Sequence, residues 1–480
     1  MNAVKQRAKN GVIWSAFERF SVQGVQFVIS VILARLLSPS DFGVVALVLV
    51  VLNILQTVNE SGFGASLMQK LDRDELDFSS VFVLNIILGI SLYGILYLLA
   101  PGISLFFKLP QLTHLTRIIG LNLIITSFVV VQRTKLLIEV DFKTLAKASF
   151  VSAIISGCTG IFCAYRGFGV MSLVLQALAN NGMNTLLIWC FVKWRPRLQF
   201  SYIRFAGLFN FAYKLILARL IDNVFQEVYS VVIGKVYSPV QLGYFNRAKS
   251  FEQLSSNNLT NIVQRVSVPI LCESQKDNQR MARVLTKFVA STALIVYPLL
   301  SGLAVLAKPL ISVLLTDKWM PAAWMLQILC PVGFFYVISA FNRNVFNATG
   351  RTDWALKSEM IRKVSSVAII VAAIYWGFTA LICSQLLIAV TEFFVDIHYT
   401  RKQIGVTLFQ QLKSVRNVFA ASLAMAVIIW ITTGLFDTYL AKLLIGSLVG
   451  AVSYLVICYL FNIEDVRIYV NKMFNRQKTE

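Results

Sequence analysis

The sequence ILARLLSPSDFG, residues 32–43, ends one long apolar segment at a Ser-Pro pair and begins the next. A second copy, VIGKVYSPVQLG, occupies residues 232–243. Its serine, its proline and its last glycine each lie 200 residues after Ser38, Pro39 and Gly43. A turn that recurs in this way between membrane-length segments indicates a duplicated transporter and not a single globular core.

The composition is that of a membrane protein. Of the 480 residues, 57% are hydrophobic and 14% are charged, and the mean hydropathy is +0.70. Apolar runs of at least about 18 residues recur along the chain, and each is long enough to cross a hydrocarbon core of roughly 30 Å as a helix. The runs lack the alternation of barrel strands. We therefore predict an all-α polytopic membrane protein with about 14 transmembrane helices.

The basic residues predict how the chain is oriented. The formal net charge is +21, but Lys and Arg lie in short loops between apolar runs. The positive-inside rule accounts for this pattern, and a nucleic-acid partner is not expected. If the N-terminus is cytoplasmic, that side has about 32 basic residues against 8 on the other. The asymmetry predicts an even number of spans with both termini in the cytoplasm.

Cysteine and histidine usage gives no sign of a metal centre. The seven cysteines lie in or beside apolar segments and form no CxxC pair, and the two histidines, His114 and His398, are far apart in sequence. We interpret the cysteines as packing residues and expect neither a metal nor a cofactor.

The repeat also predicts the domain organisation. The offset of 200 residues contains six predicted spans, and six reversals restore the starting direction. The halves are therefore expected to be parallel repeats related by an axis along the membrane normal, with the pathway at their seam. The predicted domains are an N-terminal six-helix lobe at 1–194, an amphipathic cytoplasmic linker at 195–207, a C-terminal six-helix lobe at 208–400, two additional transmembrane helices at 401–462 and a cytoplasmic tail at 463–480.

Polar side chains fall on one face of four predicted spans, and a charge at mid-bilayer costs at least about 2.5–3.5 kcal/mol on insertion scales. Such residues usually face a water-filled cavity or a charged partner. We expect a cationic cavity here, because Arg19, Arg219 and Lys249 can bind an anion such as phosphate. The substrate-binding candidates are Arg19, Gln23, Gln26, Arg219, Asp222, Asn223, Gln226, Lys249, Glu252 and Gln253.

A purely structural role is open for the same cations. Arg219 and Asp222 are three residues apart, as are Lys249 and Glu252, so each pair can form an ion pair on its own helix. Arg19 has its neighbour Glu18 and also Glu60 of the second span as available partners.

Four carboxylates are candidates for binding a coupling ion. They are Glu18, Glu60, Glu392 and Asp396. The last two lie four residues apart near the cytoplasmic end of a predicted span, where an interfacial salt bridge to Arg401 is the favoured alternative to proton or cation binding.

The stretch ILARLLSPSDFGVVAL and the later RTDWALK loop resemble the polysaccharide transporter family of the multidrug/oligosaccharidyl-lipid/polysaccharide (MOP) exporter superfamily. This family includes the Wzx-type lipid-linked oligosaccharide flippases. The resemblance implies an inner-membrane protein that moves undecaprenyl-diphosphate-linked repeat units outward by alternating access, for exopolysaccharide, capsule or O-antigen biosynthesis. It also implies membrane lipids, a coupling H⁺ or Na⁺, a polysaccharide polymerase and chain-length machinery as partners.

Two other functions remain open at this point. A drug/cation antiporter of the same superfamily would be expected to expose a carboxylate in its first-lobe cavity, and Glu18 is available for this. A membrane polysaccharide polymerase or ligase would need catalytic groups on an external loop. The predicted outer loops are short and contain no such group, so we expect a protein that is not an enzyme.

Overall fold

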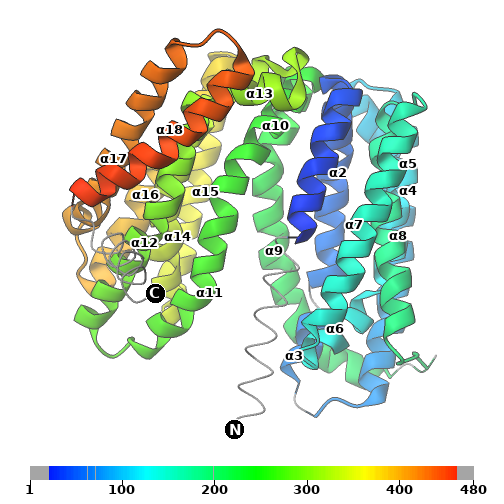
Figure 1. The fold of residues 1–480 in the computed structure, drawn as a ribbon. Coiled ribbons are helices and arrows are strands. Elements are labelled where there is room, and N and C mark those ends of the chain that lie inside the picture. Colours follow the sequence, from blue (N-terminus) through cyan, green and yellow to red (C-terminus); the bar gives the residue numbers. More distant parts are fainter. Residues whose placement is uncertain (1–20, 62, 71, 198, 200, 462–480) are drawn as a thin grey trace, which may run out of the picture. The chain divides into compact units, whose positions relative to one another are not determined.

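The computed structural model describes residues 21–461, except 62, 71, 198 and 200 (Figure 1). Every regular element in these residues is helical, which confirms the predicted all-α fold. Eight of the described helices are long and apolar enough to cross a membrane. A ninth results if α5 and α6, which meet at a bend of 42°, form one span. The total of about fourteen spans stays a prediction.

The chain divides into two compact units, Met1–Gly243 and Tyr244–Glu480. The predicted linker at 195–207 stays a prediction, but α9 begins inside it and is counted with the first unit. The first unit contains the helix Ser21–Leu36, α2 (Pro39–Ser61), α3 (Phe63–Gln69), α4 (Glu75–Phe107), α5 (Gln111–Ser127), α6 (Val130–Ile138), α7 (Phe142–Tyr165), α8 (Val170–Phe191) and α9 (Tyr202–Val236).

The helix α10 (Pro239–Ser255) begins in the first unit and continues into the second. The second unit also contains α11 (Asn257–Glu273), α12 (Asn278–Val305), α13 (Ala307–Leu315), the short 3₁₀ helix η1 (Asp317–Trp319), α14 (Pro321–Ala348), α15 (Thr352–Tyr375), α16 (Phe378–Ile404), α17 (Leu408–Gly434) and α18 (Tyr439–Leu460).

The repeated Ser-Pro motif works in the same way in both copies. Ser38 precedes α2, its hydroxyl accepts from the Asp41 backbone amide at 3.2 Å, and Asp41 Oδ2 in return accepts from the Ser38 amide at 2.8 Å. In the second copy, Ser238 Oγ accepts from the Gln241 amide at 3.2 Å at the start of α10. Proline follows each capping serine because the first helical turn does not need its missing N–H. The motif is thus a helix-starting signal used twice.

The glycine that ends each motif permits a close approach of the two copies. A Cβ atom on Gly43 would lie 2.5 Å from the carbonyl carbon of Pro239, and one on Gly243 would lie 2.9 Å from the carbonyl carbon of Pro39. Both distances are well inside the 3.5–4.0 Å at which carbon atoms normally touch. The starts of α2 and α10 therefore cross backbone to backbone, each glycine facing the other motif's proline. We call this contact the proline–glycine crossing.

Polar contacts attach the two C-terminal helices to the second unit. Buried Asn342 of α14 and Gln411 of α17 exchange two hydrogen bonds through their side-chain amides, at 2.8 and 3.0 Å. Tyr454 of α18 donates its hydroxyl to the Leu294 carbonyl of α12 at 2.8 Å. Tyr454 also belongs to a buried apolar cluster with Leu306, Ala421, Met425, Ile429 and Cys458. The pair α17 and α18 is therefore an integral part of this unit.

Candidate functional site

A polar cavity of about 500 Å³ lies in the first unit between α2 and α9. On each helix its lining residues recur at steps of three or four, so they share one helical face. The described lining consists of Asn53, Gln56, Thr57 and Glu60 on α2 and of Arg219, Asp222, Asn223, Gln226 and Glu227 on α9. Two of the polar stripes expected from the sequence thus face each other.

Tight packing next to the proline–glycine crossing fixes where this cavity begins. Residues that touch along α2 and α9 run in opposite directions, so the helices are antiparallel neighbours. Gly234 allows the close approach, because a Cβ atom there would lie 3.2 Å from Leu47 Cγ. Asn53 follows Gly43 by ten residues, about 15 Å of helix. If the turn lies at the membrane surface, the cavity opens near the middle of a hydrocarbon core of about 30 Å.

Two hydrogen bonds cross the cavity and fix its shape. Asn53 Nδ2 donates to Glu227 Oε1 at 3.1 Å, and Asn223 Nδ2 donates to Thr57 Oγ1. The other lining groups include Arg219 and Gln226, whose residues are exposed. The cavity therefore combines fixed polar pairs with side chains that reach open space.

Carboxylates outnumber cations in the described lining, and the cationic cavity expected from the sequence stays a prediction. The described residues carry three carboxylates, those of Glu60, Asp222 and Glu227, against the single guanidinium of Arg219. Helical spacing identified the polar stripes, but it could not show which stripes would face each other. The cationic partner expected in the first span, Arg19, lies outside the described residues, as does Glu18.

The remaining candidates of the first span are on the helix Ser21–Leu36. Gln23 is half-buried there and Gln26 is exposed. Neither belongs to the described lining, all of which comes from α2 and α9. Their role in substrate binding stays a prediction.

The candidates on α10 belong to the second unit. Glu252 is buried and accepts a hydrogen bond from Ser256 Oγ at 2.5 Å. It packs against α14, since a Cβ atom on Gly333 would lie 2.9 Å from Glu252 Oε1. Gln253 is half-buried, and the Lys249 ammonium lies 5.7 Å from the centre of the Phe245 ring. Glu252 thus occupies a closed site, in contrast to the exposed carboxylate of Glu60.

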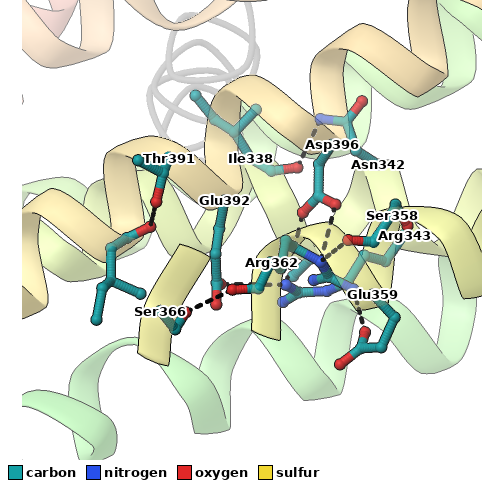
Figure 2. A network of polar contacts seen from close by, with 12 residues as sticks. Ile338, Asn342, Arg343, Ser358, Glu359, Arg362, Ser366, Thr391, Glu392 and Asp396 are labelled. Carbon is teal, nitrogen blue, oxygen red and sulfur yellow. Dashed lines mark hydrogen bonds and ion pairs between the residues drawn. The ribbon is translucent and has the colours of Figure 1, made fainter. Parts of the chain in front are cut away.

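Glu392 and Asp396 of α16 join a buried charge network in the second unit (Figure 2). Asp396 is fully buried, and its carboxylate lies 3.5 Å from Arg343 of α14 and 3.6 Å from Arg362 of α15. Glu392 lies 3.8 Å from the same Arg343. The salt bridge to Arg401 favoured from the sequence is therefore replaced by pairs with other arginines, because Asp396 faces α14 and α15.

Further ion pairs on α15 balance this network. Glu359 pairs with Arg362 and, at 3.2 Å, with Lys363. The network then contains three carboxylates and three cations. These mutual pairs can act as a clamp between helices, and a role of Glu392 and Asp396 in binding a coupling ion stays a prediction.

Sequence reasoning missed several of these groups. Thr57 and Glu227 complete the cavity, and helical spacing from Asn53 and Asn223 could have found them. Arg343 and Arg362 are not distinguished in sequence from the other basic residues that the positive-inside rule explains. Their pairing with Asp396 depends on how three helices pack, which sequence spacing does not reveal.

In the part of the chain that the structure describes, no three His, Cys, Asp or Glu side chains come close enough together to hold a metal ion. The three described cavity carboxylates are thus not such a group.

Curated relatives share about a quarter of their residues with this chain. The teichuronic acid biosynthesis protein TuaB of Bacillus subtilis (strain 168) is 24% identical over 357 residues, which cover 74% of this chain and 74% of that protein. The lipopolysaccharide biosynthesis protein WzxC of Escherichia coli (strain K12) is 23% identical over 364 residues, 75% of this chain and 74% of that protein. The succinoglycan biosynthesis transport protein ExoT of Rhizobium meliloti (strain 1021) is 24% identical over 306 residues, which cover 64% of this chain and 62% of that protein.

Solved structures share the fold. The lipid II flippase MurJ, in its inward closed conformation, superposes with a TM-score of 0.76 at 16% identity and covers 94% of this chain and 98% of its own. An inward-facing multidrug resistance MATE transporter of the MOP superfamily superposes with a TM-score of 0.63 at 16% identity. The match covers 80% of this chain and 94% of that transporter. At such identities the likeness establishes the fold of a multi-pass membrane transporter and no more.

A family model described as polysaccharide biosynthesis protein matches residues 32–324. This range includes both Ser-Pro turns and every described residue of the cavity between α2 and α9. The chain belongs to the polysaccharide biosynthesis protein family and has the fold of the MOP superfamily transporters.

Proposed function

We propose that this protein is a flippase that moves polyprenyl-diphosphate-linked oligosaccharide repeat units across the bacterial inner membrane for surface polysaccharide biosynthesis. The observation that carries the proposal is the open polar cavity of about 500 Å³ between α2 and α9, in a fold shared with a lipid II flippase. A polar cavity among membrane-length helices lets a hydrophilic headgroup cross while its lipid tail remains in the bilayer. Relatives named for teichuronic acid, lipopolysaccharide and succinoglycan biosynthesis support a glycan cargo.

The proposal includes a topology and a mode of action. Both termini lie in the cytoplasm, as the basic loops indicate, and the cavity opens alternately to the two sides of the membrane. An ion gradient of H⁺ or Na⁺ drives the cycle, with Glu60 as the cavity carboxylate placed to respond to it. A polymerase and chain-length machinery then take up the exported units. No catalytic step on the glycan is part of the proposal.

A drug/cation antiporter is the second candidate, and the charge of the described lining is the observation that supports it. In the described residues three carboxylates face the cavity with one guanidinium, and MATE transporters have a related fold. A lipophilic cation would find complementary charge there. The two candidates differ in what accumulates when the gene is removed.

Deletion of the gene followed by mass analysis of the polyprenyl-linked lipids tests the proposal. We expect single repeat units on a polyprenyl diphosphate to accumulate, and we expect them to resist periodate added outside intact spheroplasts. A polymerase mutant would instead accumulate units that external periodate oxidises. Normal lipid-linked intermediates together with increased sensitivity to cationic drugs would favour the antiporter.

A further inference from the structure

We infer that the cavity between α2 and α9 binds the glycan part of the lipid-linked substrate through its hydroxyl groups, and that it does not bind the diphosphate. The inference rests on the proposed function and names the part of the substrate that this site takes. It changes the role of Arg219 from a phosphate contact to a donor for sugar oxygens.

The charge of the cavity is the first argument. Its described lining has Glu60, Asp222 and Glu227 against Arg219, so negative groups exceed positive ones. A diphosphate brings further negative charge into a space where membrane helices reduce the screening by water. A sugar ring brings neutral hydroxyls, which gain hydrogen bonds without this repulsion.

The hydrogen-bonding groups are the second argument. In the described lining, four residues carry amides, which both donate and accept: Asn53, Gln56, Asn223 and Gln226. A sugar hydroxyl also donates and accepts, so amides and carboxylates together match its needs. Phosphate oxygens are only acceptors in their ionised form, so a diphosphate could use the donor groups of the amides and of Arg219 but could not donate to any lining carboxylate.

The geometry of the lining is the third argument. Asn53 is already bound to Glu227 at 3.1 Å and Asn223 to Thr57, so part of the polar surface is fixed before a ligand enters. Such preorganisation lowers the cost of ordering side chains on binding. The volume of about 500 Å³ lies within the range of about 300–1,000 Å³ for small-molecule sites.

A metal ion is a poorer explanation for the carboxylates. In the described residues, no group of three or more acidic, histidine or cysteine side chains is close enough to hold one. Carboxylates distributed over two helix faces are better suited to hydroxyls spread around one or more sugar rings.

The test compares three probes on the full-length protein in lipid nanodiscs. The first probe is the lipid-linked glycan extracted from the deletion strain. The second is the free glycan, released from that lipid by mild acid hydrolysis of the anomeric phosphate. The third is undecaprenyl diphosphate, which is the lipid without sugar. Binding is measured for the unaltered protein, for Arg219→Ala and for Gln226→Ala. Asn417→Ala on α17, an exposed amide in the other unit, is the matched control.

We expect both cavity substitutions to weaken binding of the lipid-linked glycan and of the released glycan. Gln226→Ala should raise the Kd by about 3- to 10-fold, which corresponds to one lost hydrogen bond. Arg219→Ala should raise the Kd by more, because its guanidinium is a charged donor. For undecaprenyl diphosphate, the Kd of each cavity variant should stay within twofold of the Kd of the unaltered protein. The control variant Asn417→Ala should bind all three probes as the unaltered protein does.

Each other outcome has a distinct meaning. If Arg219→Ala weakens undecaprenyl diphosphate tenfold or more, the cavity is a diphosphate site and the inference is wrong. If the unaltered protein binds the lipid-linked glycan and no cavity substitution weakens it, the glycan binds elsewhere and the inference is again wrong, while the flippase proposal stands. If the unaltered protein binds neither lipid, the proposed function itself fails.

Discussion

Replacing either glycine of the proline–glycine crossing should separate the starts of α2 and α10. In Gly43→Ala the new Cβ atom would lie 2.5 Å from the Pro239 carbonyl carbon, and in Gly243→Ala it would lie 2.9 Å from that of Pro39. Normal carbon contacts of 3.5–4.0 Å then require the backbones to move apart by roughly 0.6–1.5 Å. No flexible side chain stands between them to absorb this movement.

The expected magnitude combines two opposing effects. Alanine favours a helix interior over glycine by about 0.8–1.0 kcal/mol. Overpacking in a close-packed interior costs typically 1–3 kcal/mol, and more when backbone atoms must move. Because the clash here is with backbone, we expect a net loss of about 1–2 kcal/mol in the free energy of unfolding for Gly43→Ala and less for Gly243→Ala.

The two substitutions should not be additive. One separation of α2 from α10 relieves both overlaps, so the double variant should lose less stability than the two single losses combined. Thermal unfolding of the detergent-solubilised protein, followed by tryptophan fluorescence, measures these losses. Gly94→Ala in α4 is the matched control, since its Cβ atom meets nothing within 4 Å and should leave stability equal or slightly higher. Equal stability of Gly43→Ala and Gly94→Ala would refute the reasoning.

Three further predictions concern other parts of the chain. Asp396→Asn should cost about 1–3 kcal/mol of unfolding free energy, because it removes the buried carboxylate that Arg343 and Arg362 share, although each arginine keeps a second carboxylate. Adding Arg343→Gln should restore part of this loss, and no recovery in denaturant titration would contradict the pairing. Gln411→Leu should cost about 1–3 kcal/mol of unfolding free energy, because the buried side-chain oxygen of Asn342 loses its donor, and a purified variant with an unchanged melting temperature would contradict this. Cysteines at Ser38 and Ser238 should both react with an impermeant thiol reagent added outside the cell, and labelling of only one would contradict the parallel-repeat topology.

Much of the fold could be predicted from the sequence because local signals specify it. The Ser-Pro turns predict helix starts, and both copies begin helices with the serine as cap. The apolar runs predict membrane helices, and eight of the described helices meet that description. These features depend on a few neighbouring residues, so no knowledge of tertiary packing is required.

The chemistry of the candidate site was less predictable. The stripes containing Asn53 and Asn223 were visible as helical periodicity, but the decision that α2 faces α9 is made by packing around Leu47 and Gly234. That pairing determines which charges of α2 and α9 share the cavity, and in the described lining it brings together more carboxylates than guanidinium groups. For Asp396, likewise, a neighbouring Arg401 was plausible in sequence, while the true partners come from two other helices.

The duplication shows which positions the backbone constrains and which are left to function. The capping serine, the proline and the glycine recur at an offset of 200 residues, because each is required by a helix start or by a backbone contact. The cavity positions of α2 do not recur. Their counterparts at the same offset are Gln253, Ser256, Asn257 and Thr260.

These counterparts are chemically different from the cavity residues. Asn53 and Glu60 are exposed, whereas Ser256 and Thr260 are fully buried. Ser256 donates its hydroxyl to Glu252, and Thr260 donates its own to the Ser256 carbonyl, so both are bound within their own segment. A charged position of α2 has thus become a self-satisfied hydroxyl in the second copy. We conclude that the two repeats share their helix-starting motif but differ in the polar residues that follow it, and we expect substrate recognition to be sensitive to substitutions at residues 53–60.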